Sequence, residues 1–193
     1  MQQESLILEL LGLRAALRLL TPYPMPATEK ELLGLFAELG IRFTLYRHPP
    51  FFTVEDGRAH HADMPGGHCK CLFLKDKKAQ MVLAVVHEDL KVDLKALAVG
   101  LGLGRFSFCN EERMARVLGI TPGAVTPFAL INASEGSLED KESLTVIVDA
   151  HLQDYDVVHF HPLHNEATVA ITPGDLLKFI RHAGFKPIVR KLS

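Results

Sequence analysis

Residues 68–87 read HCKCLFLKDKKAQMVLAVVH, which is two apolar segments with a polar stretch between them. The first segment, 70–75, and the second, 81–87, are rich in the branched and aromatic residues that favour strands. Residues 76–80, with the sequence DKKAQ, supply a polar turn. We therefore predict two strands joined by this turn.

Helix signals flank these strands on both sides in the sequence. Thr28 and Glu31 form a capping box in front of apolar residues with helical spacing, and Gly40 stands where such a helix ends. Thr172 followed by Pro173 begins another helix. We predict further helices at 53–61, 93–101 and 110–118, and further strands at 41–46, 106–109, 128–132, 143–149, 157–160, 168–171 and 187–190. Because helices and strands do not alternate regularly, we expect an α+β fold with a mixed, largely antiparallel sheet flanked by helices.

The first 24 residues differ from the rest of the chain. Residues 5–20 are rich in leucine and would form a helix that is apolar over much of its circumference, but three charged residues argue against a membrane span. A proline-rich linker follows, and Met25 opens a stretch that resembles a natural start. Residues 1–24 are therefore either a helical extension that must be buried or an upstream extension of the reading frame without a function. We expect residues 25–193 to form one domain.

The composition is that of an ordinary soluble domain. Hydrophobic residues make up 48% of the chain, which is enough for a sizeable core. The formal net charge of −2 gives no global basic field, so a nucleic-acid partner would have to bind a local basic patch. The three cysteines lack disulfide-framework spacing, and a reducing cytoplasm is the expected location.

Lys70 lies in the first of the two predicted strands. Alternation along a strand places its side chain on the side of Leu72 and Leu74, away from Cys69 and Cys71. A lysine on an apolar side is costly unless a partner or a pocket receives it, and a phosphate is one good partner. The alternative is a lysine near a strand end whose amine reaches water.

A loop with the sequence GAVTP runs from Gly123 to Pro127, after the helix predicted at 110–118. Glycine permits close approach of the backbone to a ligand, and the proline fixes the exit of the loop. Consecutive N–H groups in such a loop can face a developing oxyanion. Many glycine- and proline-containing loops, however, are only turns.

Residues 159–165, HFHPLHN, contain three histidines, a pattern that invites a metal or an acid–base interpretation. His161 precedes a proline at a strand end, where a structural hydrogen bond is common. No second pair of ligands stands at zinc-finger spacing. We therefore favour a structural or substrate-positioning role and expect no metal.

These segments, taken together and in this order, resemble the YbaK/prolyl-tRNA-synthetase-associated domain family, in particular its single-domain deacylases ProX and PrdX, which act on alanyl-tRNA(Pro). The matching text is HPPFFTVED, PGGHCKCLFLKDKK, VDLKAL, GITPGAVTPFALIN and HFHPLHNEATVAI. The resemblance covers the chain from about residue 25 to its end and implies the α+β fold of that family.

The resemblance implies a deacylase that hydrolyses mischarged tRNA(Pro), with Ala-tRNA(Pro) as the expected substrate and with neither metal nor cofactor. It also implies that the 2′-hydroxyl of the terminal adenosine activates water or attacks the ester. Carried over residue by residue, the lysine of the family falls on Lys70, and its oxyanion-type loop falls on Gly123, Ala124 and Val125. The implied substrate-binding residues are Phe51, Cys71, Thr126, Pro127, Phe128, His161 and Asn165, and Phe52 is a further candidate for a pocket that excludes proline by size.

Two residues beside Lys70 depart from the family pattern. The family usually has asparagine directly after the lysine, where this chain has Cys71, and threonine directly before it, where this chain has Cys69. A thiol is a weak donor, so the Cys71 side chain cannot replace an amide. Three alternatives therefore stay open: a deacylase for another small amino acid such as cysteine, a tRNA-binding module without catalysis, and an interaction protein that assembles through residues 5–20. The expected partner is the acceptor end of tRNA. Prolyl-tRNA synthetase is a further candidate, no membrane is expected, and the oligomeric state is not predicted.

Overall fold

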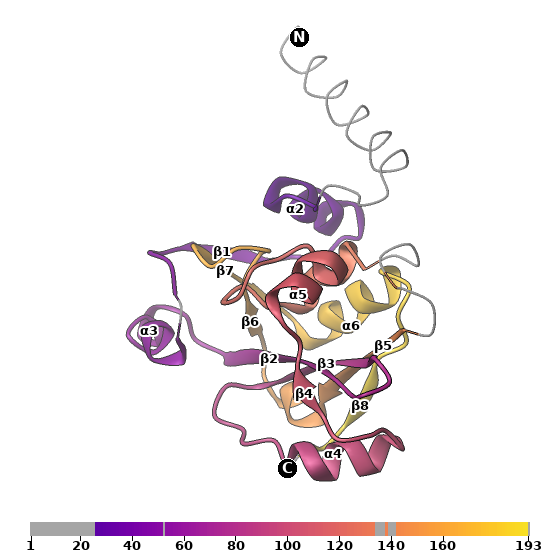
Figure 1. Cartoon of the computed structure of the whole chain (residues 1–193). Coiled ribbons are helices and arrows are strands. Elements are labelled where there is room, and N and C mark those ends of the chain that lie inside the picture. The colour runs from indigo at the N-terminus through magenta and orange to yellow at the C-terminus, as the bar shows by residue number, and fades with distance from the viewer. Residues whose placement is uncertain (1–25, 52, 134–137, 139–141, 193) are drawn as a thin grey trace, which may run out of the picture.

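An eight-stranded mixed sheet carries the fold in the computed structural model, which describes residues 26–51, 53–133, 138 and 142–192 (Figure 1). The order of strands is β1-β7-β6-β2-β3-β5-β8, with β4 beside β2. The strands are β1 (Thr44–Arg47), β2 (Gly67–Lys75), β3 (Gln80–His87), β4 (Ser107–Phe108), β5 (Ser143–Asp149), β6 (Val158–Phe160), β7 (Ala167–Ile171) and β8 (Ile188–Arg190). The helices are α2 (Glu29–Glu38), α3 (Val54–Arg58), α4 (Leu94–Leu101), α5 (Glu111–Leu118) and α6 (Pro173–His182), and the 3-10 helices are η1 (His61–Asp63), η2 (Pro127–Ile131) and η4 (Ala150–Asp154).

The two strands predicted at 70–75 and 81–87 form the antiparallel pair β2–β3. Antiparallel pairing also joins β1 to β7, β6 to β7 and β2 to β4. Parallel pairing joins β2 to β6, β3 to β5 and β5 to β8. The predicted α+β class, with a mixed sheet flanked by helices, is confirmed.

Helices cover both faces of the sheet (Figure 1). On one face, Phe73 of β2 packs in a large core with residues of α2, α5, α6 and η2. On the other face, Leu74 of β2 packs against Leu97 and Ala98 of α4. Because neighbouring residues of a strand point to opposite faces, β2 contributes to both cores in alternation.

The predicted helix starts are confirmed at Thr28, Asp93, Asn110 and Thr172, whose side chains accept hydrogen bonds from main-chain N–H groups of the first turn. The predicted helix at 53–61 is shorter than expected. Thr53 caps α3, which ends at Arg58, and η1 follows it. The caps were predictable because each depends on residues only two or three positions apart.

The strand predicted at 128–132 is wrong, because this segment forms the 3-10 helix η2. The Thr126 hydroxyl accepts from the amide of Phe128, its carbonyl accepts from the amide of Ala129, and Pro127 occupies the first turn. Phe128, Ala129 and Leu130 are all buried, so the run of apolar residues reflects burial on every side. Such a short apolar run does not distinguish a strand from a buried helix.

The predicted extension and linker at 1–24 lie outside the described residues, so the domain boundary at residue 25 stays a prediction. Phe52 also lies outside them. None of the helices in the described part of the chain has the length and apolar character needed to cross a membrane.

The turn between β2 and β3 depends on the buried carboxylate of Asp76, which accepts from the amides of Lys78 (2.7 Å), Gln80 (3.0 Å) and Gly104 (3.2 Å). Burial alone would raise the pKa of Asp76, but these main-chain donors outweigh burial and hold the pKa below its ordinary value of 3.8. We predict that Asp76→Ala lowers the free energy of unfolding by about 3 kcal/mol, because it leaves buried donors unsatisfied.

Urea unfolding at several pH values checks this prediction. Because the folded-state pKa is depressed, the stabilisation by Asp76 is present above its unfolded pKa and is lost as the pH falls below about 3.8. Asp93→Ala is the matched control, since this exposed carboxylate accepts from two amides at the start of α4. It should cost only about 1 kcal/mol. Equal losses for the two variants would show that burial of Asp76 is not the cause.

Candidate functional site

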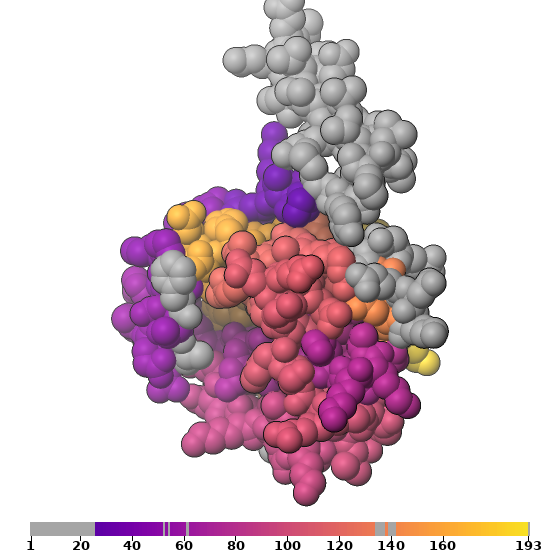
Figure 2. Space-filling view, viewed as in Figure 1, coloured from indigo at the N-terminus to yellow at the C-terminus, as the bar shows by residue number. Residues whose placement is uncertain are grey.

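A hollow of about 300 Å³ lies at an edge of β2, at a stretch where no described strand pairs with it. On that edge β2 pairs with β6 only at Gly67 and His68, and with β4 only at Leu74 and Lys75. Between these two contacts, no described strand pairs with this edge of β2. Figure 2 shows a recess on this side of the molecule, between the purple segment that contains α3 and the salmon-coloured region of α5.

Six of the residues predicted for the site line this hollow: Phe51, Lys70, Cys71, Gly123, Val125 and His161. They come from β2, from the loop before η2 and from the segments that precede α3 and follow β6. The sequence separation between them reaches 110 residues, as for Phe51 and His161. The fold therefore brings together the lysine, the loop and the histidine segment that the sequence singled out.

The other predicted site residues lie behind the walls of the hollow. Ala124, Thr126 and Pro127 are buried, and Phe128 packs edge-on against Phe36 and Phe179 in the core. Asn165 supports the wall rather than forming it: its side-chain amide donates to the Phe51 carbonyl (2.9 Å) and its own carbonyl accepts from the Phe51 amide (3.0 Å).

Sequence reasoning missed several residues that line the hollow, among them Thr53, Met64, His68, Glu88, His159 and Thr168. Some signal was available for His159, because it shares the histidine-rich segment with His161. The register of the parallel pair β2–β6 then places His159 beside His68, and the two rings stack at 4.6 Å. No local pattern predicts this pairing.

The Phe51 ring is a fixed wall of the hollow. The His48 ring stacks on it with a centroid distance of 3.6 Å and an interplanar angle of 2°. His48 is itself held at both nitrogens, by the Pro49 carbonyl (2.8 Å) and by the Thr168 hydroxyl (2.9 Å). Together with the two bonds to Asn165, these contacts allow Phe51 little freedom to move away from a bound group.

His161 presents a neutral imidazole to the hollow. Its Nδ1 lies 2.8 Å from the carbonyl oxygen of Ala167, and because a carbonyl only accepts, Nδ1 must carry the proton. Burial lowers the pKa of His161 below its ordinary value, and the neighbouring His48 and His164 lower it further. At neutral pH the Nε2 atom therefore keeps its lone pair and can accept a hydrogen bond.

The loop at 123–125 offers main-chain donors to the hollow. The amide of Ala124 is used within the turn, where it donates to the Thr121 carbonyl (3.2 Å). Gly123 adopts a positive φ of 88°, which few other residues tolerate. The N–H groups of Gly123 and Val125 donate to no described residue. These two residues line the hollow and so are the candidate donors of the loop, whereas Pro127 has no N–H to offer.

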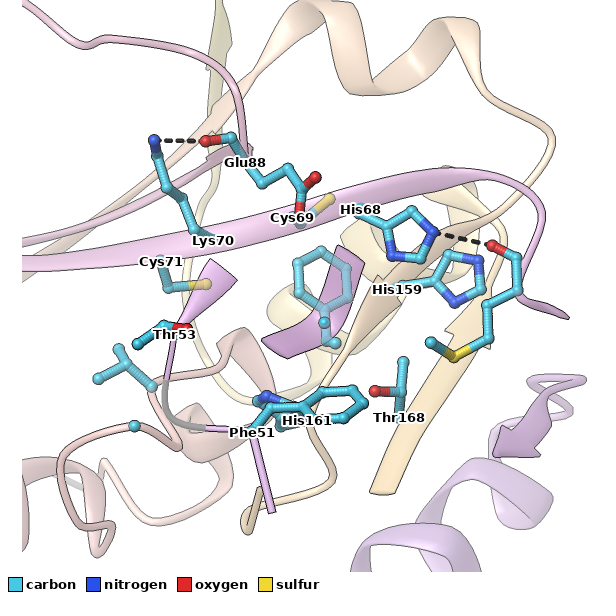
Figure 3. A pocket seen from close by; sticks show the side chains of 15 residues that line it. Phe51, Thr53, His68, Cys69, Lys70, Cys71, Glu88, His159, His161 and Thr168 are labelled. Carbon is cyan, nitrogen blue, oxygen red and sulfur yellow. Dashed lines mark hydrogen bonds between the residues drawn. The ribbon is translucent and has the colours of Figure 1, made fainter. Parts of the chain in front are cut away.

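Lys70 points away from Phe51 and His161. Figure 3 shows its side chain extending to the opposite side of β2, where the amine donates to the main-chain carbonyl of Glu88 (2.5 Å). The carboxylate of Glu88 lies 3.8 Å from Arg58 of α3. The lining of the hollow thus includes a positive charge as well as apolar side chains, namely those of Phe51, Phe160 and Val125.

None of the three thiols, of which Cys69 and Cys71 line the hollow, is prepared to act as a nucleophile. Burial raises the pKa values of Cys69 and Cys71 well above the ordinary value, and it raises the pKa of Cys109 to about 11. A thiol needs a lowered pKa to react as a thiolate at neutral pH. Among the described residues, no three His, Cys, Asp or Glu side chains are grouped so as to hold a metal ion.

Comparison with known families matches residues 48–179 to the aminoacyl-tRNA editing domain family, a range that contains all the residues described above around the hollow. The chain belongs to this family. The editing domain is 36% identical over 166 residues to prolyl-tRNA synthetase associated domain-containing protein 1 of Xenopus laevis, covering 83% of this chain and 94% of that protein. It is also 36% identical over 163 residues to the prolyl-tRNA editing protein ProX of Acetoanaerobium sticklandii, covering 83% of this chain and 96% of that protein.

Two crystal structures have the same fold as this editing domain. The hypothetical protein APE2540 superposes with a TM-score of 0.64 at 17% identity, covering 83% of this chain and 97% of that chain. A candidate trans-editing enzyme for prolyl tRNA synthetase superposes with a TM-score of 0.60 at 18% identity, covering 84% and 96%. At these identities the likeness shows the fold alone. The predicted resemblance to the YbaK/prolyl-tRNA-synthetase-associated family is confirmed.

The raised pKa values of the thiols predict slow alkylation of the native editing domain. We expect iodoacetamide to modify each of the three cysteines at least about tenfold more slowly in the native chain than in guanidinium chloride, because the thiolate fraction falls with rising pKa. Mass spectrometry of peptides from timed samples measures each site separately. If Cys69 or Cys71 were labelled in the native chain as fast as in guanidinium chloride, its thiol would not have the raised pKa described above.

Proposed function

We propose that this editing domain is a trans-editing deacylase that hydrolyses mischarged tRNA(Pro), with Ala-tRNA(Pro) as its substrate. The observation that carries the proposal is the hollow beside β2, whose lining combines a lysine, a neutral histidine, an aromatic wall and a loop with main-chain donors. A volume of about 300 Å³ suits a small aminoacyl group and part of the terminal nucleotide. The printed name of the ProX relative, a prolyl-tRNA editing protein, supports tRNA(Pro) as the class of substrate.

The proposed reaction is ester hydrolysis without a protein nucleophile. Water adds to the ester carbonyl, assisted by the 2′-hydroxyl of the terminal adenosine. The intermediate then expels the 3′-oxygen, which takes a proton and leaves free alanine and uncharged tRNA. In this proposal the N–H groups of Gly123 and Val125, two residues that line the hollow, hold the negative charge that develops on the carbonyl oxygen. Main-chain donors can accelerate acyl transfer strongly in this role.

Lys70 is assigned to the terminal nucleotide rather than to the ester. Its amine is directed away from Phe51 and His161 and already donates one hydrogen to the Glu88 carbonyl. An ammonium has three donors, so two remain for an anionic group such as a phosphate. The acylated end of the tRNA would then extend from the Lys70 side of β2 to the side of His161.

The Phe51 wall is proposed to exclude proline. A synthetase pocket cannot reject a smaller amino acid strongly, because one methylene is worth only about 1–3 kcal/mol. A second site that rejects the larger cognate amino acid by its size corrects this. Since His48 and Asn165 hold Phe51 in place, this wall can act as a limit on size.

A panel of purified Ala-tRNA(Pro), Cys-tRNA(Pro) and Pro-tRNA(Pro) tests the function. We predict that kcat/KM for Ala-tRNA(Pro) exceeds that for Pro-tRNA(Pro) by at least about a hundredfold, as a sieve requires. Preference for Cys-tRNA(Pro) would correct the substrate. Binding of all three species without turnover would support the non-catalytic tRNA-binding module instead.

Lys70→Ala should lower kcat/KM by about 10²-fold or more while the fold stays intact, because charge-assisted contacts to the nucleotide are lost. The matched control is Lys77→Ala, which removes the same charge from the exposed turn between β2 and β3. Deacylation assays at a fixed salt concentration compare the two. Equal rates for both variants would remove Lys70 from the reaction.

The pH profile should report on His161. Because its pKa is lowered, the imidazole stays neutral down to the ordinary histidine pKa of 6.5, and enzyme-dependent kcat/KM should fall only below that pH as Nε2 gains a proton. The acid limb should be absent from the residual activity of His161→Ala. Burial also lowers the pKa of His48, so His48→Gln is the control for a limb that arises from that ring. An acid limb that persists in His161→Ala would show that protonation of His161 does not cause the loss of activity.

A further inference from the structure

The main-chain N–H and C=O groups of Cys71 lack hydrogen-bond partners among the described residues. In the antiparallel pair β2–β3, residues alternate between those that exchange main-chain hydrogen bonds with the partner strand and those that point away from it. The amide of Glu88 donates to the His68 carbonyl (2.9 Å), and the amide of Asp76 donates to the Gln80 carbonyl (3.0 Å). The even-numbered residues of β2 therefore bond to β3.

The odd-numbered residues of β2 consequently direct their N–H and C=O groups to the opposite edge. Phe73 confirms this, since its carbonyl accepts from the Cys109 amide (2.9 Å) on the side of β4. Cys71 lies between the short contacts with β6 and β4, and no described residue bonds to its main chain on this edge. One donor and one acceptor of Cys71 therefore face the open edge.

The hollow lies at that edge. Cys71 lines it together with Val125 and Gly123. Figure 3 shows Cys71 on the side of β2 that faces Thr53, Phe51 and His161, opposite to Lys70. A buried main-chain group without a partner is costly, so such a pair of groups at the wall of a hollow is suited to a ligand with a matching acceptor and donor.

An aminoacyl ester has such a matching pair. Its α-ammonium is a donor and its carbonyl oxygen is an acceptor, with the same spacing as the N–H and C=O of one residue in a strand. We propose that the aminoacyl group binds as a one-residue strand addition to β2, with its ammonium donating to the Cys71 carbonyl and its carbonyl accepting from the Cys71 N–H. This inference rests on the proposed function and identifies how the acyl group is held.

The pose has two consequences for the editing reaction. The N–H of Cys71 joins those of the 123–125 loop as a donor to the oxygen that gains negative charge. Residues that pair directly across an antiparallel ladder have their side chains on the same face, so the alanine methyl would lie on the Cys71 side of β2, away from Lys70. Because recognition uses the main chain, it does not need the amide side chain that the family usually has at this position.

The test compares two proteins that differ in one main-chain atom. In the first, Cys71 is replaced by alanine. In the second, position 71 carries lactic acid, introduced by chemical ligation, which keeps the methyl side chain and replaces only the N–H by an ester oxygen. We expect the second protein to hydrolyse Ala-tRNA(Pro) about 10²–10³-fold more slowly than Cys71→Ala, the effect of losing one oxyanion donor.

Cys71→Pro gives a second comparison with Cys71→Ala. Proline removes the same N–H, and it is tolerated at strand positions whose N–H points away from the ladder. It should show a similar loss of rate with the thermal unfolding transition preserved. If Cys71→Pro fails to fold, the protein with lactic acid at position 71 alone tests the role of the N–H, because an ester keeps the extended backbone.

The ammonium contact is tested on the wild-type chain with propionyl-tRNA(Pro), which lacks the amino group. After division by the spontaneous rate of each ester, the propionyl ester should be hydrolysed at least about tenfold more slowly than the alanyl ester. Equal rates for the lactic acid and Cys71→Ala proteins, with an active wild type, would overturn this inference and leave the proposed function standing. A wild type that hydrolyses no acylated tRNA would overturn the proposed function and this inference with it.

Discussion

A strand edge inside a protein must satisfy its main-chain donors and acceptors, and β2 meets this requirement at both ends but not in the middle. On this edge, β6 pairs with β2 only as far as His68, and the pairing of β4 with β2 begins only at Leu74. Such an unpaired stretch of a strand edge can be covered by another segment of the protein, or it can face a hollow. This editing domain has the hollow, and the loop with Gly123 and Val125 faces it from the side. Lys70 and Cys71 thus belong to a central strand pair of the sheet, whose register is fixed over seven residue pairs.

Histidines hold the loops around this hollow in place. His68 bonds to the Met64 carbonyl (2.8 Å) and His159 to the Pro65 carbonyl (3.1 Å), so two stacked rings from neighbouring strands fasten the chain that leads into β2. His48 and His161 do the same for the segments on the other side. Gly66 lies so close to Val157 that a Cβ atom would come within 2.8 Å of its carbonyl oxygen. The sheet and these histidine hydrogen bonds therefore fix the walls of the hollow before a substrate binds. A rigid wall favours selection of substrates by size.

Much of the framework could be predicted because its signals are local. The caps at Thr28, Asp93 and Asn110, and the turn at Asp76, each need only a few neighbouring residues. Phe128 shows the limit of such patterns: the run after Pro127 resembles a strand, yet it is a helix turn buried in the core. The resemblance located Lys70, His161 and the glycine loop. It could not show that Lys70 is directed away from His161, or that β6 and β4 end where they do. Those features depend on strand lengths and pairings across the whole chain.

The account requires that the acylated 3′ end of tRNA binds at the gap in β2. The most direct measurement is an NMR titration of the ¹⁵N-labelled chain with 3′-alanylamido-3′-deoxyadenosine, in which an amide replaces the labile ester. The account predicts that the amide signals of Cys71, Gly123 and Val125 shift together and saturate, with that of Cys71 moving downfield as its N–H gains an acceptor. Saturable shifts confined to residues outside the hollow, with the Cys71 signal unchanged, would contradict it.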